Sequence, residues 1–332
     1  MPAQPANPVN PTPPDGAQRH TVERLRRWEL LEYGMFIHFG MITFDYWEAG
    51  DKPSSYYAPP VVDADQWIRT ARDAGMTYAV LTAKTELGHC LWPSRHTDYH
   101  VGTSGNRTDV VEAFVRACEK YGLTAGLYYN PSDQHHWVQR IAAQDPAAVP
   151  HLTRVDETYF AFQQAQIEEL LTQYGPIGEV WIDLPTVLGA EYRRRQYDQI
   201  AGLQPDAVIV MNNGRTDGSA FLPDKAWPSD VMTMERVLPA SIRGHNPWFR
   251  IDGRDYYVPG EHCDTLGYEW QFIEGDNPRS TRELLAMRTI CKERRVNFLL
   301  NVPPGRAGVI PGMHVESLEQ LRRAWRGGQG VG

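Results

Sequence analysis

Residues 63–84 read DADQWIRTARDAGMTYAVLTAK and contain one complete helix-to-strand unit. The first half has an amphipathic helical pattern, with Asp63 or Asp65 as its N-terminal cap and Gly75 as its stop signal. Residues 77–84 follow at once and are rich in residues that favour β-strands. The stretch therefore predicts a helix that leads directly into a strand.

The same alternation repeats along most of the chain. Further strand-like runs lie at residues 34–40, 124–130, 179–185, 207–213 and 297–304, and helical patterns lie at 108–122, 157–175, 189–203, 280–295 and 312–325. Loops dominate from residue 221 to 270, where DVMTMER (230–236) and HCDTLGYEW (262–270) are the best strand candidates. Apolar strands separated by helices indicate a parallel sheet covered on both faces. About eight strands in about 300 residues favour an α/β fold, a TIM-like (β/α)8 barrel in a single domain.

The chain ends differ from this middle part. Residues 1–20 are rich in Pro, Asn and Ala and predict a disordered N-terminal lead-in, residues 21–326 form the predicted barrel, and the Gly-rich residues 327–332 form a flexible tail. No run approaches the roughly 18 apolar residues that a membrane span needs. The N-terminus also lacks the apolar core of a signal peptide. We therefore predict a cytoplasmic protein without a membrane partner.

Charge and short motifs exclude several other classes of function. The formal net charge of -8 disfavours a nucleic-acid partner and fits a neutral or cationic small molecule better. The four cysteines show no C-x-x-C spacing, which argues against zinc bound by close cysteine pairs. No G-x-G-x-x-G follows the first strand and no P-loop occurs, so no nucleotide cofactor is predicted.

Polar and aromatic residues gather where the predicted strands end, which in such barrels is the catalytic edge. They are His38, Lys84, Thr85, Glu86, Tyr128, Tyr129, Asn130, Trp181, Asp183, Asn212, Asn213 and Asn301, with Trp47 and Glu48 after the first strand and Glu235, Glu261 and Asp264 in the irregular region. Aromatic faces stack on sugar rings and polar groups bind sugar hydroxyls, so the mixture is typical of a carbohydrate site. Glycoside hydrolysis needs two carboxyl groups, one to protonate the leaving oxygen and one to attack or activate water.

Residue types alone leave other interpretations open. Asp183 could be a structural carboxylate held by backbone amides, and His38 could be a core histidine. A metal-dependent barrel hydrolase is a further alternative, but the histidines have no compact ligand spacing. His135 and His136 are adjacent, and neighbouring residues of an extended segment point to opposite faces. No metal site is predicted.

Six motifs resemble the catalytic domain of glycoside hydrolase family 29, the α-L-fucosidases, and occur in the family's order. They are YGMFIHFG (33–40), DADQWIRTARDAGMTYAVLTAK (63–84), GLTAGLYYNPSD (122–133), EVWIDLP (179–185), GEHCDTLGYEWQF (260–272) and RRVNFLLNVPPGRAGVIP (294–311). The last motif contains Asn-x-Leu-Leu-Asn-x-x-Pro, which is uncommon outside the family. The resemblance spans about residues 28–325.

This resemblance implies a retaining exo-glycosidase of the α-L-fucosidase type that acts on a small carbohydrate substrate. Asp183, two residues after Trp181, matches the family's nucleophile. Glu261 matches the general acid/base, and Glu235 is the runner-up because the placement of this residue varies within the family. Sugar contacts are expected from a wider set, namely His38, Trp47, Glu48, Lys84, Thr85, Glu86, Tyr129, Trp181 and Trp270.

One motif departs from the family. Where the family has Lys-His-His-Asp-Gly-Phe, with two histidines that bind fucose hydroxyls, residues 84–89 read KTELGH. Neutral imidazole can donate or accept a hydrogen bond, whereas ionised Glu86 only accepts. The site should then recognise a different hydroxyl pattern, unless Glu86 is protonated or pairs with Lys84. A glycosidase with altered sugar specificity, or a catalytically silent sugar-binding barrel, are therefore the alternatives.

The family's usual C-terminal β-sandwich has no counterpart in this sequence, which continues only briefly after the helical pattern at residues 312–325. We therefore expect the acceptor side of the site to be more open than in the family, or to be completed by another subunit of a homo-oligomer.

Overall fold

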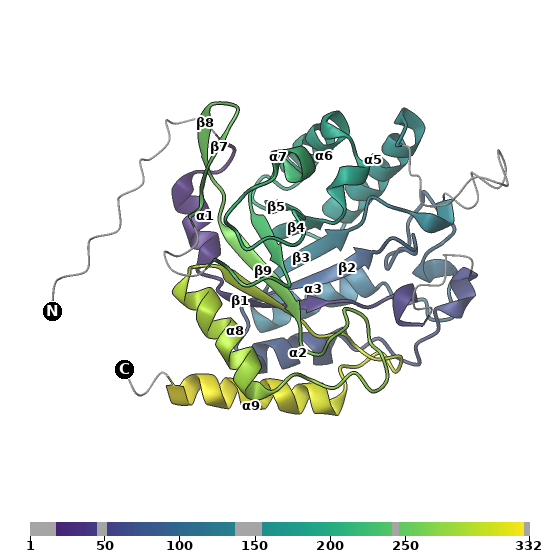
Figure 1. The fold of residues 1–332 in the computed structure, drawn as a ribbon. Helices are drawn as coiled ribbons and strands as arrows, with labels where there is room; N and C mark the ends of the chain where they lie inside the picture. The colour runs from purple at the N-terminus through teal and green to yellow at the C-terminus, as the bar shows by residue number, and fades with distance from the viewer. Residues whose placement is uncertain (1–17, 45–51, 137–154, 241–245, 329–332) are drawn as a thin grey trace.

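The computed structural model describes residues 18–44, 52–136, 155–240 and 246–328, and its centre is a barrel of eight parallel strands (Figure 1). Their pairing order is β5-β4-β3-β2-β1-β10-β9-β6, and a parallel bridge between Val210 and Val231 brings the two end strands together. The predicted (β/α)8 barrel is confirmed. The barrel strands are β1 (Tyr33–Ile37), β2 (Tyr78–Lys84), β3 (Thr124–Tyr129), β4 (Glu179–Ile182), β5 (Val208–Met211), β6 (Met232–Glu235), β9 (Gly260–Thr265) and β10 (Asn297–Asn301).

Helices surround the barrel (Figure 1). Asp63 caps α2 by accepting a hydrogen bond from the Gln66 amide at 2.9 Å, while Asp65 lies in the first turn. Gly75 ends the helix in the left-handed conformation, with φ of 81°. The last helix includes residues 327 and 328, which we had assigned to the tail. The longer helices outside the barrel are α2 (Ala64–Ala74), α3 (Val110–Tyr121), α5 (Glu157–Thr172), α6 (Ala190–Leu203), α8 (Thr281–Glu293) and α9 (Gly312–Gly328), and α7 (Pro223–Ala226) is a single turn.

The connection from β6 to β9 departs from the repeating pattern. Its described residues form an antiparallel hairpin of β7 (Trp248–Ile251) and β8 (Arg254–Tyr257) where a helix would be expected. Asp252 and Gly253 make the two-residue turn, both with positive φ, at 48° and 78°. Asp-Gly between two strand-like runs is a strong hairpin signal, and our reading of the irregular region overlooked it.

An unpredicted helix, α1 (Val22–Glu29), packs across the N-terminal ends of the strands. Leu25 and Trp28 are buried there, in the same cluster as the apolar side chains of the barrel interior. The Trp28 indole donates a hydrogen bond of 3.2 Å to the Glu179 carboxyl at the start of β4. This end of the barrel is thus closed by protein.

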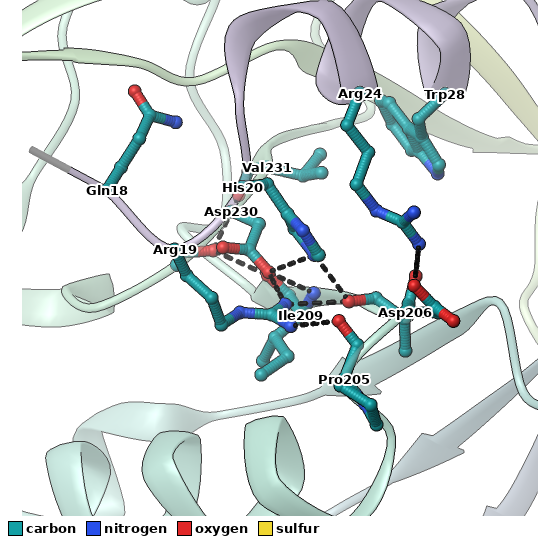
Figure 2. Close-up of polar contacts among 12 residues, drawn as sticks. Gln18, Arg19, His20, Arg24, Trp28, Pro205, Asp206, Ile209, Asp230 and Val231 are labelled. Carbon is teal, nitrogen blue, oxygen red and sulfur yellow. Dashed lines mark hydrogen bonds and ion pairs between the residues drawn. The ribbon is translucent and has the colours of Figure 1, made fainter. Parts of the chain in front are cut away.

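The residues ahead of α1 hold the seam between β5 and β6 (Figure 2). Arg19 donates a hydrogen bond to Asp230, and the same carboxylate accepts one from the Ile209 amide at 2.8 Å. His20 is buried beside them, 3.9 Å from Asp230. Of the predicted lead-in at 1–20, residues 18–20 are therefore packed against the barrel, and residues 1–17 lie outside the described part of the chain.

Candidate active site

A cavity of about 420 Å³ lies over the C-terminal ends of the barrel strands. The opposite end is closed by α1, so the cavity is a pocket with its floor inside the barrel. It is lined by aromatic, amide and carboxyl side chains from almost every strand end, namely Phe36, His38, Thr85, Glu86, Tyr128, Asn130, Ser132, Asp133, Gln134, Trp181, Asp183, Leu184, Asn212, Glu235, Cys263, Trp270 and Gln271.

Asp183 follows β4 directly and is held by three hydrogen-bond donors. The Tyr128 hydroxyl donates at 2.6 Å, the Asn212 side-chain amide at 2.8 Å and the backbone amide of Leu184 at 2.9 Å. Leu184 has left-handed backbone angles, φ 45° and ψ 47°, which are uncommon for a residue with a side chain. This turn brings its amide back onto the carboxylate of the preceding residue. Asp183 is therefore fixed in orientation while still facing the pocket.

Glu235 ends β6 and shares a hydrogen-bond donor with Asp183. The Asn212 Nδ2 donates to Glu235 Oε2 at 3.1 Å as well as to Asp183. The Asn212 Oδ1 accepts from the Gly214 amide at 2.7 Å and the Thr233 hydroxyl at 2.8 Å, which fixes the direction of the amide group. Burial raises the pKa of Glu235, and the nearby Asp183 raises it further. The pair therefore combines a carboxylate held by three donors with a carboxyl group that favours its protonated form.

His38 is nearly buried and lies beside the indole of Trp270, with ring centroids 5.3 Å apart. Its Nδ1 lies 2.7 Å from Asn301 Oδ1. Because the Asn301 nitrogen donates to the Trp270 carbonyl at 2.7 Å, its oxygen faces His38, and the His38 Nδ1 is the donor. Burial lowers the pKa of His38 to about 4, so the imidazole is neutral and its Nε2 is an acceptor.

The departing KTELGH motif contributes Thr85 and Glu86 to the pocket wall, but not Lys84. The Lys84 ammonium is buried behind the wall, 3.3 Å from Asp133 Oδ2, and also donates to two backbone carbonyls. Burial raises the pKa of Glu86, and the nearby Asp183 raises it further. The ion pair of Lys84 is thus with Asp133, and the alternative of a protonated Glu86 fits this environment better.

Tyr128, rather than the predicted Tyr129, reaches the pocket. Tyr129 is buried on the other face of β3, where its hydroxyl donates to Gln166 at 2.8 Å and its ring lies 4.6 Å from the Lys84 ammonium. The cause is the two-residue period of a strand, which points neighbouring side chains to opposite faces. The signal was therefore present in the sequence, since both tyrosines were among the polar strand-end residues.

Glu261 lies at the opposite end of the barrel from the pocket. It is the second residue of β9, has no exposed surface, and accepts hydrogen bonds from the Tyr78 hydroxyl at 2.8 Å and the Trp181 indole at 3.1 Å. A general acid must reach the leaving oxygen of the substrate. Glu261 does not line the pocket, whereas the runner-up Glu235 does.

The remaining predicted residues divide between the pocket and the undescribed segments. Trp181 and Trp270 line the pocket, as expected. Trp47 and Glu48 lie outside the described residues. Asn212 makes the most important contact beyond the expected catalytic and sugar-binding residues, and its signal was its place among the polar residues at the strand ends.

Neither a metal centre nor a membrane-spanning helix is found in the described residues. In the four described segments, no group of three or more His, Cys, Asp or Glu side chains is placed to hold a metal ion. Two histidines considered as ligands have other contacts: His135 stacks on Tyr99 at 3.9 Å and His136 on Phe162 at 4.7 Å. Among the helices of the described residues, none has the length and apolar composition of a membrane span.

Comparison with known proteins identifies the family of this chain. A family model described as alpha-L-fucosidase matches residues 43–326. This chain belongs to the alpha-L-fucosidase family. Among curated members, alpha-L-fucosidase 1 of Arabidopsis thaliana is 32% identical over 316 residues, and the match covers 89% of this chain and 58% of the plant protein. The chain therefore spans less than two thirds of the length of that family member.

Solved structures of the family have the same fold. A Bacteroides thetaiotaomicron protein, solved as a candidate alpha-L-fucosidase, superposes with a TM-score of 0.74 at 27% identity, over 95% of this chain and 68% of that one. Alpha-L-fucosidase isoenzyme 1 of Paenibacillus thiaminolyticus superposes with a TM-score of 0.73 at 25% identity, over 93% of this chain and 76% of that one.

Proposed function

We propose that this member of the alpha-L-fucosidase family is a retaining exo-glycosidase that hydrolyses a terminal α-L-fucosyl or closely related bond. The observation that carries the proposal is the pair of carboxyl groups, Asp183 and Glu235, bridged by one Asn212 nitrogen at the mouth of an aromatic-lined pocket. Since both oxygens lie within 3.1 Å of that nitrogen, they are at most about 6 Å apart. Retaining enzymes place these groups about 5–5.5 Å apart and inverting enzymes about 6.5–9.5 Å.

In the first step, Asp183 attacks the anomeric carbon while the bond from that carbon to the leaving oxygen breaks. Glu235 gives its proton to that oxygen, which leaves as an alcohol. The three hydrogen bonds to Asp183 fix the orientation of its carboxylate, and burial favours the protonated form of Glu235 at the start of the step. The product is a glycosyl ester on Asp183.

In the second step, ionised Glu235 takes a proton from water while the water oxygen attacks the anomeric carbon. The ester bond to Asp183 breaks, and both carboxyl groups return to their first states. Because the two attacks come from opposite faces of the sugar, the anomeric configuration is retained. The closed floor of the pocket, which includes Trp181 and Phe36, suits a terminal sugar residue rather than the interior of a chain.

The identity of the sugar is tested separately because Thr85 and Glu86 line the pocket. A protonated Glu86 both donates and accepts hydrogen bonds, so it can replace an imidazole as a partner for a hydroxyl group. An ionised Glu86 only accepts, which favours a related sugar with a donor at that position. This observation supports altered sugar specificity as the second candidate.

The experiment is hydrolysis of aryl α-L-fucoside and of a panel of related aryl glycosides, with the anomer of the first product followed by NMR. We expect one glycoside to be cleaved with retention, and a 2-deoxy-2-fluoro analogue of the same sugar to label Asp183 in peptide mass spectra. Inversion, or label on another residue, would contradict the proposed mechanism. Sugar binding without turnover of any glycoside would instead support the silent sugar-binding barrel.

A further inference from the structure

Strand β4 connects the two ends of the barrel through three inward-facing residues. Glu179, Trp181 and Asp183 are two residues apart, so their side chains lie on the same face of the strand. Glu179 is buried at the N-terminal end, Trp181 lies in the floor of the pocket, and Asp183 is the proposed nucleophile. Any group that holds Trp181 is therefore in a position to affect the pocket from below.

Glu261 is such a group. Its Oε1 accepts the hydrogen bond from the Trp181 indole at 3.1 Å, and its Oε2 accepts that from the Tyr78 hydroxyl at 2.8 Å. Indole nitrogen is a donor only, so this carboxylate is the kind of partner that Trp181 needs when buried. The carboxylate itself is completely buried, which makes both hydrogen bonds strong.

A second carboxyl group, that of Glu179, reduces the energetic cost of burying Glu261. Glu179 Oε2 accepts from the Trp28 indole at 3.2 Å, while its Oε1 has no donor in the described residues. The Glu179 and Glu261 side chains are within hydrogen-bond reach of each other. Two carboxyl groups can share a hydrogen bond only if one carries a proton, and Glu261 already accepts on both oxygens. Glu179 is therefore the protonated partner, which donates to Glu261.

The support continues from Trp181 to the catalytic edge. The Trp181 indole stacks on the Tyr128 ring, with centroids 5.4 Å apart and planes inclined by 20°. The Tyr128 hydroxyl donates the 2.6 Å hydrogen bond to Asp183. The Trp181 indole thus donates its hydrogen bond to Glu261, and the rings of Trp181 and Tyr128 connect Glu261 to Asp183.

We propose that Glu261 is a positioning residue, which holds Trp181 and, through the Trp181–Tyr128 stack, sets the placement of Asp183. It takes no part in proton transfer to the substrate. The proposal rests on the function given above, because it assigns the rate effect of Glu261 to the nucleophile of that reaction. It also accounts for the family-like GEHCDTLGYEW motif, in which Glu261 matched the acid/base residue without reaching the pocket.

The experiment compares Glu261→Gln with the matched variant Glu179→Gln on aryl glycosides of the cleaved sugar with good and poor leaving groups. In Glu261→Gln, either the Trp181 indole or the Tyr78 hydroxyl loses its acceptor. We therefore expect kcat to fall roughly 10- to 100-fold, equally for all leaving groups, with little change in KM. In Glu179→Gln an amide N–H replaces the carboxyl proton as donor, so kcat should stay near that of the unmodified protein. Thermal unfolding shows whether each variant is folded at the assay temperature.

Several results would overturn the proposal. One is full activity in Glu261→Gln. Another is a loss that is largest for poor leaving groups, together with a slowed second step on activated aryl glycosides that azide accelerates, which would make Glu261 the acid/base and remove Glu235 from that role. If Glu261→Gln does not fold, Tyr78→Phe is used in its place, because it removes the Tyr78 hydroxyl that donates to Glu261. It should give a smaller loss of kcat that is also equal for all leaving groups. A Tyr78→Phe loss that depends on the leaving group, or no loss, would count against the proposal.

A crystal structure of Glu261→Gln gives a readout that does not depend on activity. We expect the Trp181 ring and the Asp183 carboxylate to shift together, and an unchanged position of both would contradict the inference. If the unmodified protein cleaves no glycoside, the proposed function fails, yet this comparison of structures still decides the positioning role.

Discussion

The two ends of the barrel each contain a pair of carboxyl groups, and β4 contributes one member to each. At the N-terminal end, Glu179 and Glu261 are completely enclosed by α1 and the barrel interior. At the C-terminal end, Asp183 and Glu235 face a pocket. All four side chains end in a carboxyl group, so the surroundings decide the role. Carboxyl groups without space beside them serve the structure, and those beside an open cavity can meet a substrate.

The comparison predicts opposite responses to mutation at the two ends. Removing a pocket carboxylate should abolish activity and leave the fold intact, because active-site charges are held at some cost in stability. Removing a carboxylate from the closed end should reduce stability, because its donors then lose a buried partner. Measuring rate and unfolding free energy on the same variants separates the two effects.

The largest effect is expected for Asp183→Asn, which keeps the size of the side chain and removes the proposed nucleophile. We expect kcat/KM to fall roughly 10⁴-fold or more, with the free energy of unfolding within about 1 kcal/mol of the unmodified protein. Initial rates and urea unfolding curves provide the check. A variant with full rate would show that the family-like EVWIDLP motif does not supply the nucleophile.

Glu235→Gln should have the next largest effect, a loss of roughly 10²- to 10⁴-fold on substrates with poor leaving groups and much less on activated aryl glycosides. The unmodified protein should also lose activity as the pH rises through the raised pKa of Glu235, because the proposed general acid is then deprotonated. This basic limb of the kcat/KM profile should be absent in Glu235→Gln. An unchanged basic limb would place the acid elsewhere.

The same comparison shows what could be predicted from the sequence. The barrel and most of its strands follow from the alternation of apolar runs and helical patterns, and Asp183 from its place at a strand end. Glu261 was assigned by motif alone. The strand predicted to begin at His262 places Glu261 at its N-terminal end. Active sites of such barrels lie at the C-terminal ends of the strands, so Glu261 belongs to the end away from the pocket. Glu235 closed the neighbouring strand candidate and had the position of a catalytic residue.

Other features were beyond a reading of the sequence because they depend on tertiary contacts. The bridging role of Asn212 requires the ends of β5 and β6 to meet beside β4, which only closure of the barrel brings about. The burial of Lys84 depends on Asp133, a loop residue distant in sequence. The α1 helix was missed for a simpler reason, because its short pattern lies next to the Pro-rich lead-in.

At the closed end, Asp230→Ala should cause the largest loss of stability. Asp230 is 6% exposed and accepts hydrogen bonds from Arg19 and the Ile209 amide (Figure 2). It also accepts a hydrogen bond from the Tyr197 hydroxyl. Leaving these donors unpartnered should cost about 3–5 kcal/mol in the free energy of unfolding, with kcat unchanged at temperatures where the variant is folded. Equal stability of the variant and the unmodified protein in denaturant would contradict this role at the barrel seam.

Asp206→Ala is the matched control for that experiment. Asp206 pairs with Arg24 on the same side of the barrel (Figure 2). The two charged groups are 3.1 Å apart, but the Asp206 side chain is 88% exposed. Exposed pairs contribute about 0–1 kcal/mol. A loss as large as that of Asp230→Ala would show that burial does not explain the difference.

The smallest effect concerns pH and the closed pair itself. Burial raises the pKa of Glu261 to about 7, and burial together with Glu261 raises the pKa of Glu179. As the pH rises from about 4.3, the usual pKa of Glu, the unfolded chain loses protons that the folded pair retains. Because of this pair, the free energy of unfolding decreases as the pH rises. The decrease is at most about 1.4 kcal/mol per pH unit for each proton that the folded pair retains.

Glu179→Gln removes one of these titrations and keeps a donor toward Glu261. Its free energy of unfolding should therefore fall less steeply between pH 5 and pH 7 than that of the unmodified protein. Glu319→Gln is the control, because Glu319 is 55% exposed on α9 and should leave the slope unchanged. If the free energy of unfolding changes with pH equally in Glu179→Gln and Glu319→Gln, Glu179 is not the protonated partner of Glu261.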